Sequence, residues 1–246
     1  MFFIACPLVF CAGFVDSIGG GGGIISLPAY IFAGLPAHYA IATNKLSSAM
    51  GTAVSTARYC KNGYCDYSLA IPGIIAALIG AQFGSKLALS VSDSVLKTVM
   101  IFILPVIAVF ILRKPKMETI KKKELSKTYQ IVIISVSSLL IGLYDGFYGP
   151  GTGTFLILTF TALAGMSPLT AAGNTKLINL ASNISALLVF LRSGYILIPL
   201  ALATSVFSIL GHYLGAGFAI KKGEKIIRPI IIGVIILLFL KVIIDF

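Results

Sequence analysis

Lys45 and Lys176 are the residues of this sequence whose type and position most clearly suggest chemistry. They lie in the similar segments 43–46 (Thr-Asn-Lys-Leu) and 174–177 (Asn-Thr-Lys-Leu), inside otherwise apolar stretches. A lysine at the centre of a membrane helix costs about 2.5 to 3.5 kcal/mol, so such a charge indicates a functional site. With the neighbouring hydroxyl and amide groups, the two lysines could bind an oxyanion. The alternative is that each lysine extends to the membrane interface or pairs with an aspartate.

Two glycine-rich stretches are the second feature. Residues 19–23 are five consecutive glycines, and residues 149–153 read Gly-Pro-Gly-Thr-Gly. Glycine costs roughly 1 kcal/mol relative to alanine inside a helix, so a helix must break at both places. Matching breaks in two halves of a membrane protein point to the binding site of a secondary transporter. The N–H groups that open the following helical pieces, near Ile24 and Thr154, could also bind an anion.

Three titratable residues are candidates for carrying a coupling proton. Asp16 and Asp145 precede the two breaks, and burial raises the pKa of a carboxyl group, so either could hold a proton. The favoured interpretation is that they cap exposed N–H groups or pair with a lysine. His212 is the third candidate, because histidine ordinarily changes its charge near neutral pH.

The predicted substrate-binding residues are Lys45, Lys176, Thr43, Asn44, Asn174, Thr175, Gly21, Gly22, Gly23, Gly151, Thr152 and Gly153. Asn179 and Asn183 could extend this polar surface, and their counterparts in the first half are Ser48 and Thr52.

Several kinds of site are not indicated. The glycine run is not a phosphate-binding P-loop, because no Gly-Lys-Ser or Gly-Lys-Thr follows it. No cluster of His, Cys and carboxylate residues suggests a metal, a cofactor or an enzyme activity. The four cysteines, Cys6, Cys11, Cys60 and Cys65, form no metal-binding pattern. We expect them to be unpaired thiols, since free cysteine is commonly buried.

Composition places these residues in a membrane protein. The chain is 58% hydrophobic and only 11% charged, whereas soluble domains carry about 25% charged residues. Its 246 residues leave room for about eight helical segments of near-spanning length. The net charge of +11 would suggest nucleic acid in a soluble protein, but here it sits mostly in short loops and indicates membrane orientation. Residues 1–15 lack the basic region of a signal peptide, so we expect them to belong to the mature structure.

The apolar segments form a pattern that occurs twice. They are predicted at 2–15, 24–35, 38–59, 69–89, 95–112, 131–144, 155–164, 168–191, 196–220 and 230–244. Lys176, Gly194 and Gly211 follow Lys45, Gly63 and Gly80 at one constant spacing, which indicates duplication. We therefore predict two all-α repeats, each a glycine-broken segment followed by three helices.

The repeats are predicted to span residues 1–112 and 128–246. The loop between them, 113–127, contains seven Lys or Arg and two Glu, so we expect it to be cytoplasmic. If each broken segment crosses the membrane, the halves are parallel; if each is a re-entrant hairpin, they are inverted. Inversion is favoured because it brings the cluster Lys221, Lys222, Lys225 and Arg228 to the cytoplasmic side, although Arg192 then faces outward.

The sequence resembles the sulfite exporter TauE/SafE family, and within it a branch of probable bacterial membrane transporter proteins. The resemblance rests on the glycine-rich opening after 13–16 (Gly-Phe-Val-Asp), on the lysine segments 42–46 and 173–177, and on Arg-Ser-Gly-Tyr at 192–195. The family's motif positions carry over to 20–23, 43–45, 149–153 and 174–176. The resemblance implies a multi-pass permease of the bacterial inner membrane for sulfite or organosulfonates.

The sequence therefore predicts a secondary transporter of a small anion that lies in the lipid bilayer, with a proton as the candidate coupling ion. We expect no nucleic acid, cofactor or enzyme activity. Two alternatives stay open. An anion channel would conduct through the same pocket without coupling to an ion gradient. A membrane scaffold would use its polar interior for a partner and bind no anion.

Overall fold

The computed structural model describes residues 1–96, 98, 125–223, 225–227, 229–230 and 232–233 of the chain. All of the secondary structure in these residues is helical, which confirms the all-α prediction. The helices are α1 (Phe2–Gly19), α2 (Gly23–Phe32), α3 (Ala37–Lys61), α4 (Tyr67–Ser90), α6 (Lys127–Phe147), α7 (Thr152–Ala162), α8 (Pro168–Ser193) and α9 (Ile198–Lys222). Most of the predicted segments 95–112 and 230–244, most of the loop 113–127, and Arg228 lie outside the described residues.

Five of these helices, α1, α4, α6, α8 and α9, are long and apolar enough to cross a membrane. The chain is therefore a multi-pass membrane protein. Helix α3 has 25 residues but is more polar, because it carries Thr43, Asn44, Lys45 and Ser47 on its buried side. Helices α2 and α7, with 10 and 11 residues, are too short to span the bilayer.

Both glycine breaks produce hairpins. After α1, Gly20 and Gly21 adopt left-handed φ values of 76° and 84°, a conformation that glycine adopts without strain. Helix α2 then returns toward the start of α1, where Tyr30 and Ala33 pack with Ala5. The sequence predicted that the first apolar segment ends at residue 15. The last turn of α1 instead continues to Gly19, so the break begins at Gly20.

The second hairpin joins α6 and α7. Gly149 and Gly151 have φ values of 98° and 83°, and the chain reverses between Phe147 and Thr152. The end of α7 lies beside the start of α6, where the Gln130 side-chain amide donates a hydrogen bond of 2.7 Å to the Ala164 carbonyl. Each broken segment is therefore a hairpin that enters and leaves at one end of the molecule.

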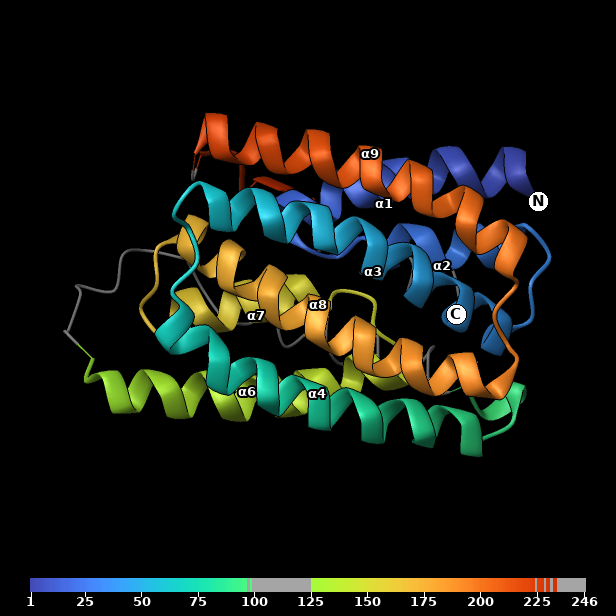
Figure 1. Cartoon of the computed structure of the whole chain (residues 1–246), viewed down its shortest axis with the longest axis horizontal. Coiled ribbons are helices and arrows are strands. Elements are labelled where there is room, and N and C mark those ends of the chain that lie inside the picture. The colour runs from blue at the N-terminus through green and yellow to red at the C-terminus, as the bar shows by residue number, and fades with distance from the viewer. Residues whose placement is uncertain (97, 99–124, 224, 228, 231, 234–246) are drawn as a thin grey trace.

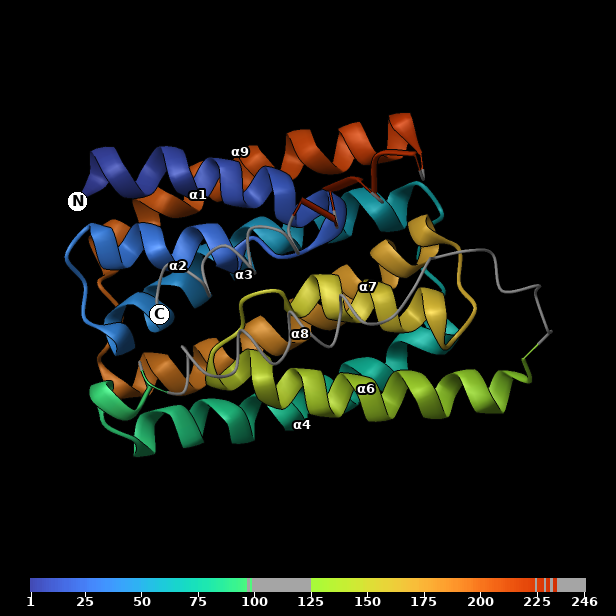
Figure 2. The ribbon, with the colours of Figure 1, turned by 180° about the vertical axis from the view of Figure 1, so that it is seen from behind.

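The helices form two groups that lie side by side (Figures 1 and 2). One group contains α1, α2, α3 and α9, and the other contains α4, α6, α7 and α8. Glycines allow close approach within each group. The Cα of Gly80 on α4 lies against the Leu139 carbonyl of α6, and Gly211 on α9 lies against the Phe10 carbonyl of α1. Small residues of this kind drive helix packing in membranes, where the hydrophobic effect contributes little.

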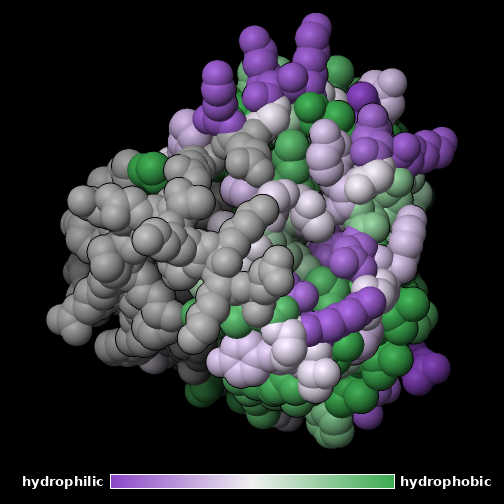
Figure 3. All heavy atoms as spheres, turned by 90° about the vertical axis from the view of Figure 1, so that its left-hand side faces the viewer, coloured by the Kyte–Doolittle hydropathy of each residue, from purple (hydrophilic) through white to green (hydrophobic). Residues whose placement is uncertain are grey.

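The two hairpins enter from opposite ends of the bundle. Helix α1 starts at one end, here called the Met1 end, and α6 starts at the other, here called the Lys127 end (Figure 1). Lys221 and Lys222, which close α9, lie at the Lys127 end, whereas Arg192, near the end of α8, lies at the Met1 end. Figure 3 shows hydrophilic side chains gathered over part of the Lys127 end.

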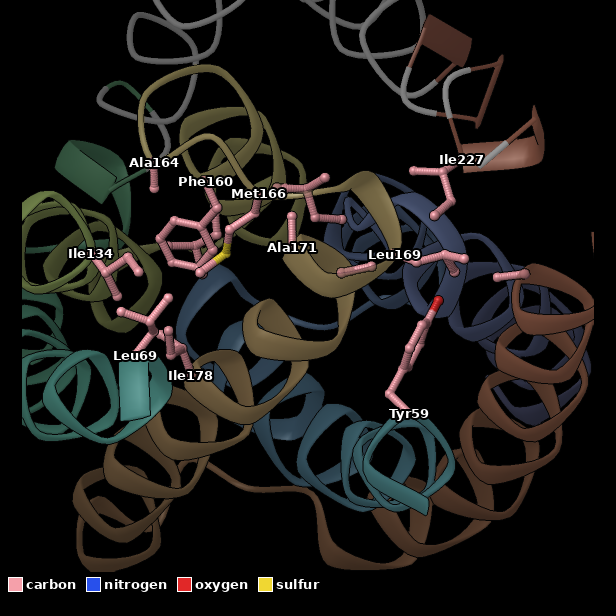
Figure 4. Close-up of a cluster of buried hydrophobic side chains, with 14 of the residues drawn as sticks. Tyr59, Leu69, Ile134, Phe160, Ala164, Met166, Leu169, Ala171, Ile178 and Ile227 are labelled. Carbon is pink, nitrogen blue, oxygen red and sulfur yellow. The ribbon is translucent and has the colours of Figure 1, made fainter. Parts of the chain in front are cut away.

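A cluster of buried apolar side chains fixes α7 against its neighbours (Figure 4). Phe160 of α7 and Ile134 of α6 are fully buried and belong to one cluster with Ile178 of α8. The buried Tyr59 of α3 belongs to the same cluster, and its hydroxyl donates a hydrogen bond of 2.9 Å to the Ser17 carbonyl of α1. The rigid packing on both sides of the breaks holds their backbone in place.

The prediction of four unpaired cysteines is wrong for two of them. Cys60 and Cys65 form a disulfide, and their Cα atoms are 5.0 Å apart. The pairing arises because the chain reverses between the end of α3 and the start of α4, which brings the two Cα atoms within disulfide range. Cys6 and Cys11 are free thiols.

Candidate functional site

The two hairpin turns meet at the centre of the molecule. The Cα of Gly20 lies against the backbone of Gly153 and Thr154, with no room for a side chain. The Thr154 hydroxyl donates a hydrogen bond of 2.9 Å to the Gly19 carbonyl. The N-termini of α2 and α7 are thus brought together. A helix N-terminus carries a partial positive charge and free N–H groups, so this junction favours an anion.

One ion pair, between Asp16 of α1 and the fully buried Lys176 of α8, lies beside this junction. The Lys176 ammonium is 2.7 Å from Asp16 Oδ2 and also donates to the Asp16 carbonyl. His212 Nε2 lies 3.2 Å from the same carboxylate oxygen. The other oxygen, Oδ1, accepts a hydrogen bond of 3.0 Å from the Gly22 N–H. Asp16 therefore both pairs with a lysine and caps the start of α2.

A second buried ion pair lies on the other side of the junction. The Lys45 ammonium is 2.9 Å from Asp145 Oδ2, and the two side chains are only 2% and 4% exposed. The Ser182 hydroxyl donates to Oδ2 at 2.6 Å and the Thr152 hydroxyl to Oδ1 at 2.9 Å. The side-chain amide oxygen of Asn183, Oδ1, accepts a hydrogen bond from the Lys45 ammonium at 3.2 Å. The Asp145 carboxylate thus accepts from two hydroxyl groups, whereas the Asp16 carboxylate contacts a histidine and a backbone N–H group.

Each pair joins the two halves of the chain. Asp16 comes from the first half and Lys176 from the second, while Lys45 comes from the first and Asp145 from the second. The pairing with aspartate that the sequence left open is therefore present for both lysines. Buried charges are costly unless they are paired and hydrogen-bonded, and these four side chains satisfy one another.

A small cavity opens between the two pairs. The cavity has a volume of about 30 Å³, which is room for about two water molecules. Among the predicted substrate-binding residues, those that line it are Asn44, Lys45, Gly21, Gly22, Gly23, Gly151, Thr152 and Gly153. Asp16, Asp145 and His212 line it as well, together with Ser48, Thr52, Asn179 and Asn183.

The other predicted residues lie away from the cavity lining. Lys176 is fully buried behind Asp16. Thr43 accepts a hydrogen bond of 3.2 Å from the Leu197 N–H, and Asn174 accepts one of 2.8 Å from the Asp66 N–H. These two side chains accept hydrogen bonds from the backbone N–H groups just before α9 and α4, so their contacts hold neighbouring helices together. The Thr175 hydroxyl is buried and has no partner among the described residues.

The cavity also has lining residues that the sequence did not single out. Ser208 and Ser26 contribute hydroxyl groups, and Gly13 lies on α1 where a side chain would contact His212 Nδ1 at 2.7 Å. Gly51 likewise leaves space for the His212 ring. One signal in the sequence marks these positions: each is a small residue on a helix otherwise rich in bulky apolar side chains.

No group of three metal-ligating side chains is present in the part of the chain that the structure describes. The site contains a pair of helix N-termini, two lysine–aspartate pairs and one histidine around a polar cavity. This arrangement can hold a small polar or anionic species by hydrogen bonds and charge.

Comparison with known proteins agrees with these features. The model of the family described as sulfite exporter TauE/SafE matches residues 5–242. The probable membrane transporter protein ORF9 of a Sinorhizobium species is 38% identical over 236 residues, covering 96% of this chain and 90% of that protein.

Two further relatives cover nearly the whole chain. A probable membrane transporter protein of Haemophilus influenzae is 34% identical, covering 97% of this chain and 94% of its own length. The probable membrane transporter protein YfcA of Escherichia coli K12 is 31% identical, covering 100% of this chain and 89% of its own length. No solved structure matches the chain. The chain belongs to the sulfite exporter TauE/SafE family, as its sequence motifs predicted.

Proposed function

We propose that this protein is a secondary transporter of a small anion, and that a sulfur-containing oxyanion or organosulfonate is its substrate. The family and the names of its relatives support transport. The single observation that carries the proposal is the central cavity, where two helix N-termini and the Lys45 ammonium face one small polar space inside a membrane bundle. Transporters of other folds bind substrates at broken helices in the same way.

The binding step requires a rearrangement of the ion pairs. Lys45 is engaged with Asp145 at 2.9 Å, and the cavity has room for only about two waters. A sulfite or sulfonate group has at least four heavy atoms, so the cavity must widen to admit it. The anion would then compete with Asp145 for Lys45, while backbone N–H groups at the N-termini of α2 and α7 donate to its oxygens. Lys176 would act through Asp16.

We also propose that the chain consists of two inverted repeats, 1–112 and 128–246, joined by a cytoplasmic loop at 113–127. Support comes from the two hairpins that start at opposite ends, and from the paired contacts of Lys45 and Lys176. Opening alternately toward the two ends would carry the anion across. The excess of lysines at the Lys127 end, as at Lys221 and Lys222, favours that end as the cytoplasmic one.

Binding of anions to the detergent-solubilised protein tests the proposal. We would measure thermal stabilisation by sulfite, sulfate, thiosulfate, sulfonates and carboxylates. A ligand at 100 times its dissociation constant stabilises the folded protein by about 2.7 kcal/mol. Stabilisation by a sulfur anion should be lost in Lys45→Gln and Lys176→Gln, and kept in the control Lys86→Gln, which changes an exposed lysine of α4.

The alternatives give different results. A scaffold would show no stabilisation by any anion. An anion channel would bind weakly, and its flux in liposomes would rise with concentration without saturating. Equal stabilisation of wild type and Lys45→Gln would refute the role proposed for the cavity.

A further inference from the structure

We propose that a proton on His212 determines whether the cavity accepts an anion, so that one proton is transported with each anion. This inference rests on the proposed anion transport and specifies its coupling ion and stoichiometry.

The two ring nitrogens of His212 both face hydrogen-bond acceptors. Nε2 lies 3.2 Å from Asp16 Oδ2, and Nδ1 lies 2.9 Å from the Ser208 carbonyl oxygen. The Ser208 hydroxyl is farther away, at 3.4 Å from Nδ1. A neutral imidazole has one N–H group, and only the protonated ring donates at both nitrogens. The observed contacts are therefore both satisfied when His212 is a cation.

The charged groups around His212 are otherwise balanced, so a proton on His212 sets the net charge of the site. Helix α1 presents Asp16 to the ring, and Lys176 of α8 contacts the same carboxylate. Helix α3 presents Gly51, which is uncharged. Across the cavity lie Lys45 and Asp145, paired with each other.

With His212 protonated, three cations face two carboxylates, and the site has a net charge of +1. A single negative anion neutralises that surplus. Without the proton the site is neutral, and an added anion would be an uncompensated buried charge, which is strongly disfavoured. The proton and the anion therefore favour each other's binding, and linkage makes this coupling reciprocal.

The second ion pair, Lys45 and Asp145, has no histidine at the equivalent position. At the spacing that relates Lys45 to Lys176, the residue equivalent to His212 is Ala81, and its carbonyl lies against Gly146. Asp145 accepts hydrogen bonds from the Ser182 and Thr152 hydroxyls instead. Hydroxyl groups do not titrate, so only one of the two pairs can take up a proton in this way. The inferred stoichiometry is one proton for each anion.

The proton balance of a cycle is simple. One N–H bond forms at His212 with a proton from water on the side where the anion enters. The same bond breaks on the exit side, where the proton returns to water. No other covalent bond changes.

Methanesulfonate is a suitable probe, because its charge stays at −1 throughout the relevant pH range. Its dissociation constant for the solubilised protein would be measured between about pH 5.5 and 8.5. Wild type should bind it more weakly as the pH rises, with a slope approaching tenfold for each pH unit at the upper end, as expected when one proton is co-bound. His212→Gln, which cannot take up the proton, should lose the slope.

The matched control is His38→Gln, since His38 is the other of the two histidines in the sequence. It pairs with Asp93, following α4 at the Met1 end, and does not line the cavity. This variant should keep the wild-type slope. Calorimetry in buffers of different ionisation enthalpy adds a test on the unaltered protein, in which binding should take up about one proton for each methanesulfonate.

The outcomes separate the two proposals. Binding of methanesulfonate with the same affinity at every pH, or without proton uptake, would overturn the coupling at His212 and leave the anion site standing. A slope that persists in His212→Gln would also overturn it. Failure of methanesulfonate and of every other sulfur anion to bind at any pH would overturn both proposals.

Discussion

Removing the carboxylate charge of Asp145 should destabilise the protein strongly and make its stability depend on anions. The substitution Asp145→Asn keeps the size of the side chain and an oxygen that can accept from the Ser182 and Thr152 hydroxyls. It leaves the Lys45 ammonium, which is 2% exposed, without the Asp145 carboxylate at 2.9 Å, its one carboxylate partner among the described residues. The perturbation is thus confined to one charge.

The expected magnitude follows from that burial. Breaking a buried ion pair by removing one partner costs about 3 to 5 kcal/mol, whereas replacing both partners with apolar residues is often neutral or stabilising. The double variant Lys45→Met/Asp145→Leu should therefore be closer to wild type than the single variant. Asp93→Asn is the control: its side chain is 42% exposed, so loss of its pair with His38 should cost no more than about 1 kcal/mol.

Unfolding in detergent, with and without a sulfonate, measures these effects. A bound anion should replace the missing carboxylate beside Lys45, so Asp145→Asn should gain more stability from the anion than wild type does. Two results would contradict the role of Asp145 as the partner of a buried ammonium. One is a single variant no less stable than the double variant. The other is an anion that stabilises wild type and fails to stabilise Asp145→Asn.

Three further predictions test the packing. Gly84→Leu should destabilise the protein by at least about 1 to 3 kcal/mol, because its Cβ would overlap a carbonyl of α6. The control is Phe83→Leu, which changes an exposed side chain of the same helix. Equal thermal midpoints for the two variants would contradict the contact. Thr43→Val should cost about 1 to 3 kcal/mol by leaving the Leu197 N–H without its acceptor, and unchanged amide exchange at Leu197 would disprove this. The denatured, unreduced protein should show two maleimide-reactive thiols, and four after reduction; four in both cases would exclude the Cys60–Cys65 disulfide.

The sequence predicted the parts of the fold that depend on local composition. The apolar segments gave the described helices to within a few residues, because length and hydrophobicity determine which stretches cross a bilayer. The five glycines predicted a break, but not that the helix continues through Asp16 to Gly19. Helix ends depend on hydrogen bonds such as that from the Gly22 N–H to Asp16, which composition does not reveal.

The candidate site was predictable where it was polar. Lys45, Asp16, Asp145 and His212 stand out because charged residues are rare inside apolar helices. The partner of each lysine was not predictable, because it depends on which helices of the two halves pack together. Thr43 belongs to the same motif as Lys45, yet it points to the backbone before α9. A motif identifies a stretch of helix, and the packing decides which of its faces lines the cavity.

Uptake of labelled sulfite into liposomes that contain the purified protein tests whether the anion crosses the membrane by binding in the cavity. We expect uptake that saturates with concentration and is accelerated by unlabelled sulfite on the opposite side. It should be lost in Lys45→Gln, while Lys86→Gln retains it. Uptake that rises linearly with concentration would indicate a channel. Equal rates for wild type and Lys45→Gln would contradict the claim that the anion binds in the cavity between the two hairpins.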